Sequence, residues 1–142
     1  MLVAARDSRR LGRVTLSLNA FVPKPWTPLQ WLGLDEVAQL QQKTKRVINA
    51  LKGAGNIDCS SDVPQWGYVQ ALLARGDRRV GGLLLLVHRW RGQWRKAFRE
   101  WSLNPDFYVY RRRSLKEILP WDHLEAGISK EHLVAEFQRT GL

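Results

Sequence analysis

The chain has 142 residues, of which 44% are hydrophobic and 25% are charged, and these proportions are typical of one ordinary globular domain. Seven tryptophans in so short a chain argue against disorder. The longest apolar run, Leu83–Val87, is far shorter than the ~18 residues that a membrane helix needs. The single cysteine, Cys59, excludes an internal disulfide. We therefore expect a soluble, cytoplasmic protein with no membrane partner.

Basic side chains dominate the middle of the chain. Lys and Arg number 23 against 13 Asp and Glu, which gives a formal net charge of +10. Residues 72–113 carry 11 basic and 3 acidic side chains, whereas residues 114–142 carry 3 and 5. A basic segment of this kind suits an anionic partner, such as RNA or a phosphate-bearing ligand. On charge alone, a solvated basic face that keeps the chain in solution is the simpler interpretation.

The N-terminal part of the sequence predicts one strand. Apolar and polar residues alternate over residues 14–22 with a period of two, as in a strand with one apolar face. Three prolines within residues 23–28 then end the strand, since proline cannot donate to a ladder. A lone strand cannot satisfy its own backbone groups. Its partner is therefore either the short stretch 57–60 or strands that this chain does not contain.

Helical periodicity follows the strand. The first predicted helix begins at Asp35 and ends at Gly53 or Gly55. The second starts near Pro64 and stops at Gly76, which we interpret as a left-handed cap.

A third predicted helix is capped by Asp77 and runs without a break to Trp101. Its arginines at positions 91, 95 and 99 form a stripe that either grips phosphates or covers the edge of the core. Ser114 begins a capping box for a short helix that ends at Pro120, and Ser129 caps the last helix. The predicted fold class is mainly α with one or two strands (α/β).

Catalytic motifs are not evident. The three histidines, at positions 88, 123 and 132, have no metal-ligand spacing, and one cysteine supplies no cluster. We therefore predict no catalytic residue and no metal ligand on this chain.

One local feature departs from the usual rules. Arg78 and Arg79 occupy the first turn of the third predicted helix, where the helix dipole disfavours cations, and Arg75 lies just before them. Acids of the tail, Asp122 or Glu125, could pair with these arginines and make the cluster structural. Alternatively, the arginines and the helix N–H groups form an anion site. The sequence does not decide between the two.

Five stretches of the chain carry a resemblance to a known family. The first reads Asn-Ala-Phe-Val-Pro-Lys-Pro-Trp-Thr-Pro-Leu-Gln-Trp over Asn19–Trp31, and the others are Gln70–Val80, Phe107–Arg111, Leu119–Asp122 and Gly127–Lys130. Each is similar to a stretch in the C-terminal region of radical SAM proteins of the cobalamin (B12)-binding type, and they occur in the family's order. The resemblance covers about residues 14–138.

The resemblance implies the last strand of a partial TIM-like radical SAM barrel, followed by a helical C-terminal extension. Residues 1–34 would supply that strand and a Pro-rich rim segment, and residues 35–142 the helical region, packed with it as one unit. Asn19, Lys24 and Gln30 would lie at the barrel rim, within reach of cofactor or substrate. The complete protein would use a [4Fe-4S] cluster and S-adenosylmethionine, with cobalamin as a further candidate cofactor.

The chain departs from that family in its cysteines. The family holds its cluster through a Cys-x-x-x-Cys-x-x-Cys loop, and this chain offers only Cys59. The resemblance therefore implies the C-terminal portion of an enzyme, inactive alone, whose partners are the missing N-terminal barrel and cobalamin-type domain. The alternatives are a free-standing basic helical module that binds RNA and a purely structural interaction domain.

Overall fold

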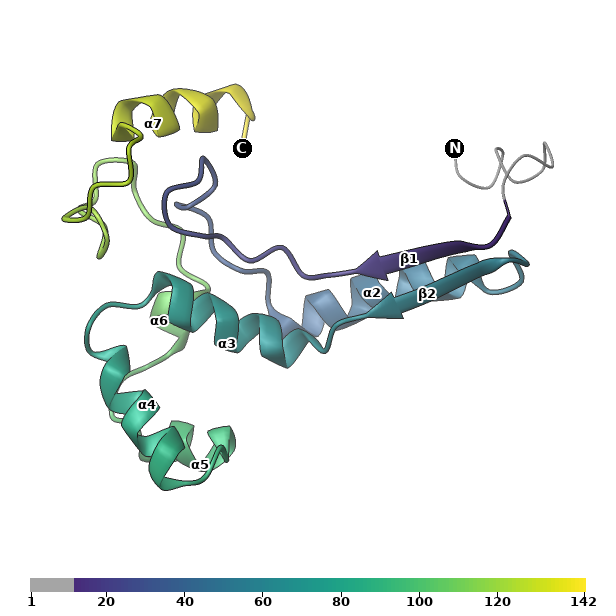
Figure 1. The fold of residues 1–142 in the computed structure, drawn as a ribbon, viewed down its shortest axis with the longest axis horizontal. Coiled ribbons are helices and arrows are strands. Elements are labelled where there is room, and N and C mark those ends of the chain that lie inside the picture. The colour runs from purple at the N-terminus through teal and green to yellow at the C-terminus, as the bar shows by residue number, and fades with distance from the viewer. Residues whose placement is uncertain (1–11) are drawn as a thin grey trace. The chain divides into compact units, whose positions relative to one another are not determined.

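The computed structural model describes residues 12–142, which are mainly helical with two parallel strands (Figure 1). This confirms the expected mainly α fold with few strands. Contacts divide the chain into two compact units. The sheet unit comprises residues 12–21 and Asp35–Gly67, and the helical unit comprises Val22–Leu34 and Tyr68–Leu142.

No helix in the described part of the chain is long and apolar enough to cross a membrane. Residues 1–11, which belong to the predicted segment 1–34, lie outside the described residues.

The sheet unit is a β–α–β element. Strand β1 (Val14–Leu18) is followed by helix α2 (Val37–Leu51) and strand β2 (Ile57–Ser61). The strands pair in parallel, from Val14 opposite Ile57 to Leu18 opposite Ser61, and Figure 1 shows them side by side. The partner expected at 57–60 is thus the one that β1 uses. A parallel pair needs a long crossover, which α2 provides.

Strand β1 is shorter than predicted. It spans five residues, whereas the alternating pattern ran to residue 22. The ladder ends near Leu18, whose carbonyl accepts from the Asp62 N–H at 3.1 Å. The three prolines that follow exclude further pairing.

The helical unit contains the buried core. Helix α3 (Pro64–Arg75) begins in the sheet unit and continues into the helical unit, and the later helices follow it. These are α4 (Val80–Arg89), α5 (Trp94–Glu100), α6 (Asp106–Val109) and α7 (Lys130–Arg139). One core cluster consists of Trp31, Leu119, Trp121, Leu133 and Phe137.

The third predicted helix is not continuous, and this prediction was wrong. Helix α4 ends at Arg89 and α5 begins at Trp94, with Arg91 and Gly92 at φ angles of 48° and 82° between them. A continuous helix would place residues 82 and 101 about 28 Å apart. The break lets α5 fold back, so that Gly82 lies near the Trp101 indole nitrogen and Glu100 accepts from Arg89 and Trp90. The arginine stripe 91–95–99 therefore does not lie on one helix.

The predicted helix after Ser114 is also absent from the structure. The segment forms a turn in which the Glu117 N–H donates to the Ser114 carbonyl. A capping box needs the Glu117 carboxylate to reach back to Ser114. Here that carboxylate instead accepts from Arg111, at 2.6 and 2.7 Å. Pro120 leaves too little chain to form a stable helix without the box.

The two remaining helix-end predictions had different outcomes. The Ser129 hydroxyl accepts from the His132 N–H at 3.2 Å and caps α7 as predicted. Gly76 follows the end of α3 but does not adopt a left-handed conformation, so that interpretation was wrong. Glycine is required there for space. A Cβ at Gly76 would lie 2.3 Å from the Val80 Cγ2 and 2.7 Å from the Leu72 carbonyl oxygen.

Candidate functional site

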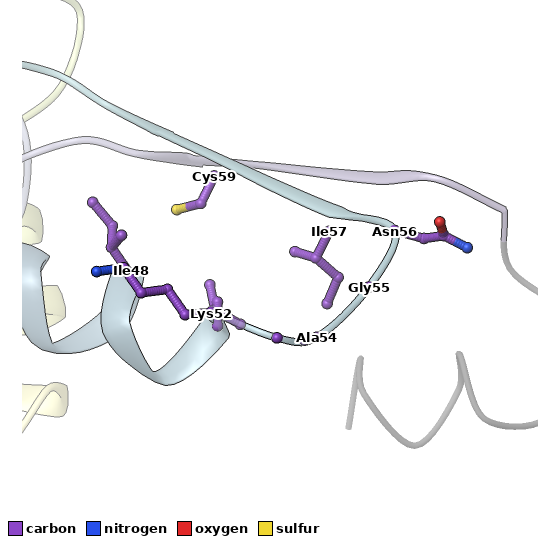
Figure 2. Close-up of a pocket in the computed structure, with 9 residues that line it drawn as sticks. Ile48, Lys52, Ala54, Gly55, Asn56, Ile57 and Cys59 are labelled. Atoms are coloured by element: carbon purple, nitrogen blue, oxygen red, sulfur yellow. The ribbon is translucent and has the colours of Figure 1, made fainter.

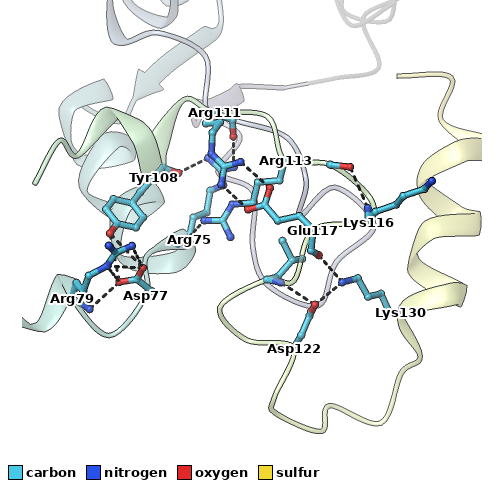
Figure 3. A network of polar contacts seen from close by, with 12 residues as sticks. Arg75, Asp77, Arg79, Tyr108, Arg111, Arg113, Lys116, Glu117, Asp122 and Lys130 are labelled. Atoms are coloured by element: carbon cyan, nitrogen blue, oxygen red, sulfur yellow. Dashed lines mark hydrogen bonds and ion pairs between the residues drawn. The ribbon is translucent and has the colours of Figure 1, made fainter.

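Arg75, at the end of α3, is the centre of a buried polar network in the helical unit (Figure 3). Its side chain is fully buried. The Nη1 donates to the carbonyls of Tyr108 and Val109 at 2.6 and 2.5 Å, and the Nη2 donates to the Arg111 carbonyl at 2.6 Å. Arg75 thereby satisfies three carbonyls at the end of α6 and in the segment after it. Its place is structural.

Two further arginines surround Arg75. The buried Arg113 donates through Nη2 to the Arg75 carbonyl, and its backbone N–H donates to the Trp31 carbonyl at 2.8 Å. Arg111 forms the two-pronged ion pair with Glu117. Glu117 is thus the carboxylate that pairs with one member of this group of three arginines.

Burial, hydrogen bonds and neighbouring charges shift the pKa values of these groups. Burial, followed by the neighbouring Arg113 and Arg111, lowers the pKa of Arg75 to about 10. Burial is also the largest cause that lowers the pKa of Arg113. The hydrogen bonds from Arg111 hold the pKa of Glu117 below its usual range. The Nε of Arg75 and the Nε and Nη1 of Arg113 have no hydrogen-bond partner among the described residues.

Arg78 and Arg79 line a separate cleft of ≈ 600 Å³ at the start of α4, together with Asp77, Pro120 and His123. Arg79 is held by Asp77 through its Nε and Nη2, at 3.0 and 2.6 Å. The same carboxylate accepts from the Arg79 backbone N–H at 2.9 Å, within the turn that precedes α4. The N-cap of α4 is Arg79 and no side chain caps this helix, so the prediction that Asp77 caps it was wrong. These hydrogen bonds hold the pKa of Asp77 below its usual range. Arg78 is exposed.

Asp122 and Glu125 are not the partners of Arg75, Arg78 or Arg79, so that alternative was wrong. Asp122 accepts from Lys130 at 2.5 Å and from the Leu119 N–H at 2.9 Å. Glu125 is exposed and lines a neighbouring cleft of ≈ 500 Å³ with Trp26 and Ser129. The counter-ion of Arg79 is the adjacent Asp77. The prediction from sequence had assigned this role to acids much farther along the chain.

Substitution of these two arginines tests their role. We expect Arg78→Ala to leave the melting temperature unchanged. Arg79→Ala should lower the melting temperature only slightly, because the Arg79 side chain is 57% exposed and its ion pair is screened by water. Thermal melts of both variants measure this. A large drop in the melting temperature of either variant would contradict the assignment.

The three rim candidates lie in different surroundings. Asn19 is exposed just after β1, and Lys24 is exposed in the Pro-rich segment. Gln30 is 1% exposed, and its Oε1 accepts from the Trp121 indole at 2.7 Å and from the Trp26 N–H at 3.1 Å. Gln30 therefore fixes the Pro-rich segment against the core, and we do not retain it as a ligand-binding candidate.

Cys59 lines a cleft of ≈ 350 Å³ in the sheet unit (Figure 2). The cleft lies between the end of α2 and β2, and its other lining residues include Ile48, Lys52 and Ile57. No group of three or more His, Cys, Asp or Glu able to hold a metal occurs in the described part of the chain.

Sequence reasoning missed Arg111, Arg113 and Glu117 as a network. The only signal was the run Arg111-Arg112-Arg113 followed by an acid at 117, which resembles a solvated charge run. Burial distinguishes the three arginines, since Arg113 is 4% exposed and Arg112 is exposed.

Comparisons with protein-family models, with curated proteins and with solved structures found no match for this chain. The site therefore has to be interpreted from its own geometry.

Proposed function

We propose that this chain is the C-terminal portion of a radical SAM iron–sulfur enzyme and completes a barrel whose other strands lie outside it. In this proposal the sheet unit supplies strands at the end of the barrel. The helical unit shapes access to the barrel mouth. The alternating strand, the Pro-rich segment and the five family-like stretches motivate the proposal.

One observation, the distribution of buried side chains, carries the proposal. Every buried hydrophobic side chain of the described residues belongs to the helical unit, and none to the sheet unit. The sheet unit holds two parallel strands and one helix, and no side chain of α2 is fully buried. Parallel strands occur almost only in sheets covered on both faces, and small two-stranded sheets are marginal alone. A β–α–β element of this kind is expected to continue into a larger sheet.

The two faces of the sheet differ in polarity. Val14, Leu16 and Leu18 alternate with the exposed Thr15 and Ser17 along β1. On β2 the half-buried Ile57 and Cys59 lie opposite Val14 and Leu16 in the register, and both line the cleft beside α2. The apolar face is thus the one that α2 covers. In a barrel the helices lie outside, so the polar face would point inward.

The cofactors of the family do not fit this chain alone. A [4Fe-4S] cluster needs several thiolates, and Cys59 is the one cysteine of the sequence. In the proposal, another polypeptide segment holds the cluster and S-adenosylmethionine, and cobalamin if it is used. This chain then contributes no residue that ligates iron.

Co-expression tests the proposal. A polypeptide that carries the cysteine loop and the earlier barrel strands should co-purify with this chain. Ser17→Arg should abolish the complex, because it places a cation on the polar face that would become the barrel interior. Gln42→Arg, on an exposed position of α2, is the matched control and should retain the complex. Equal binding by both variants, or no complex with the unaltered chain, would contradict the proposal.

RNA binding is less well supported. Within residues 72–113, Arg75 and Arg113 are buried and Arg79, Arg89 and Arg111 are in ion pairs, which leaves fewer guanidinium groups for phosphates. A steep salt dependence of RNA affinity would favour this alternative over the barrel proposal.

A further inference from the structure

The cleft of ≈ 600 Å³ at the start of α4 has the size of a small-molecule site. Two turns that are distant in the sequence line it. The turn before α4 contributes Asp77, Arg78 and Arg79, and the segment after Leu119 contributes Pro120 and His123. All five lining residues belong to the helical unit, so a ligand in this cleft does not depend on the proposed barrel.

The carboxylate in the cleft is already occupied, whereas two donors are not. Asp77 accepts from Nε and Nη2 of Arg79 and from the Tyr108 hydroxyl at 3.4 Å (Figure 3). The Arg79 Cζ also lies 5.8 Å from the centre of the Tyr108 ring, which holds this guanidinium in place. The side chains of Arg78 and His123 are exposed and have no hydrogen-bond or ion-pair partner among residues 12–142. The cleft therefore offers free donors and no free carboxylate.

The N–H groups at the start of α4 are not available to a ligand. The Arg79 N–H donates to the Asp77 carboxylate at 2.9 Å. The next three N–H groups, at residues 80–82, donate to the carbonyls of residues 77–79 at 3.0 to 3.1 Å. An anion in this cleft would thus be bound by side chains and not by the end of the helix.

Buried positive charge lies close to the cleft. The Arg113 Nη2 donates to the Arg75 carbonyl, two residues before Asp77, and its Nε and Nη1 have no partner among the described residues. Burial is the largest cause that lowers the pKa of Arg113, and attraction to Asp77 is one of the smaller causes that raise it, so these two charges lie within electrostatic range. The cleft and the buried network together hold five guanidinium groups, at positions 75, 78, 79, 111 and 113, and two carboxylates, at positions 77 and 117. This excess favours a multiply charged anion.

We infer that this cleft binds the phosphate group of a small organic molecule through the Arg78 guanidinium and the His123 imidazole, beside the Arg79–Asp77 pair. The planar fork of a guanidinium matches two phosphate oxygens. A phosphate monoester carries about −1.5 to −2 charges at pH 7, which suits the excess of guanidinium groups better than a carboxylate does. The cleft has about twenty times the ~30 Å³ that one water molecule occupies, which leaves room for an organic body beside the phosphate.

Phenyl phosphate and benzoate are matched probes, because they share a ring and differ in carrying a phosphate or a carboxylate. The full chain is titrated with each at neutral pH and constant ionic strength, and its backbone N–H signals are followed in nitrogen–proton spectra. Phenyl phosphate should cause saturable shifts at residues 78–82 and at His123. Benzoate should bind about tenfold more weakly, since it carries less charge.

Variants separate this site from general attraction to a basic protein. Arg78→Ala should weaken phenyl phosphate binding about tenfold, as the loss of a charge-assisted hydrogen bond does, and His123→Ala should also weaken it. The matched control is Arg95→Ala, which removes an equal charge at an exposed position of α5 and should leave the affinity unchanged. Because Arg78 is exposed, its replacement should not alter the melting temperature, so that lost binding is not lost folding.

Three results would overturn the inference: no saturable binding of phenyl phosphate, equal affinities for the two probes, or equal weakening by Arg78→Ala and Arg95→Ala. Binding of single-stranded RNA that Arg78→Ala weakens, without binding of phenyl phosphate, would also overturn it, in favour of a contact with a nucleic-acid backbone. The co-expression experiment is independent of these outcomes, because the cleft lies within the helical unit alone.

Discussion

Arg75→Ala is expected to lower the free energy of unfolding of the helical unit by about 3–5 kcal/mol, because three carbonyls would lose a charged donor inside the protein. Those carbonyls belong to Tyr108, Val109 and Arg111. Arg75→Lys should recover only part of the loss, since one ammonium group cannot reproduce the planar fork of the guanidinium. Urea unfolding followed by tryptophan fluorescence measures both variants.

The control for Arg75 is Arg78, three residues away and exposed. Its replacement by Ala should leave the unfolding curve where it is. If Arg75→Ala unfolds at the same urea concentration as the unaltered chain, the buried network is not the structural centre of this unit.

Gly33→Ala should destabilise the same unit by about 3 kcal/mol or more, through a backbone clash rather than a lost contact. A Cβ at Gly33 would lie 2.0 Å from the carbonyl oxygen of Tyr110 and 2.6 Å from its carbonyl carbon. The segment cannot move away freely, since the Leu34 N–H donates to the Val109 carbonyl and the Arg113 N–H to the Trp31 carbonyl. The backbone segments around Gly33 and Tyr110 would both have to shift.

Gly81→Ala is the matched control for Gly33. A Cβ at Gly81, in α4, meets nothing within 4 Å. Alanine favours helix over glycine, so this variant should gain about 1 kcal/mol in the same urea experiment. Equal effects of the two substitutions would show that the close approach of residues 33 and 110 is not maintained in solution.

Local signals predicted most of the elements. The period of two located β1 and the apolar spacing located α2 and α3, although α2 begins two residues later than Asp35. The Ser129 cap was predicted because a capping residue acts within one helical turn. Such features depend on neighbours in the sequence, which a pattern can report.

Features that depend on distant partners were not predicted. The break at Arg91–Gly92 allows Trp101 to return to Gly82, and only tertiary packing selects it over a continuous helix. Similarly, the Glu117 carboxylate accepts hydrogen bonds from Arg111 and does not form the predicted capping box. Gln30 was placed at a rim from resemblance, while the structure uses its amide oxygen to hold Trp121.

The candidate site shows the same contrast between features set by sequence neighbours and features set by distant partners. Arg75, Arg78 and Arg79 stand out in the sequence as three cations around a helix start, and the structure gives each a different role. Arg75 is buried among carbonyls, Arg79 is neutralised by Asp77, and Arg78 is exposed. The exposure of each side chain determines these roles, and residue type alone does not carry that information.

The genomic sequence that precedes the codon of Met1 is a direct test of the proposed radical SAM barrel. The barrel proposal predicts that the reading frame continues upstream, or that an adjacent gene encodes a Cys-x-x-x-Cys-x-x-Cys loop within a series of strand–helix repeats. Several kilobases on either side without such a loop would contradict the proposal that this chain completes a radical SAM barrel.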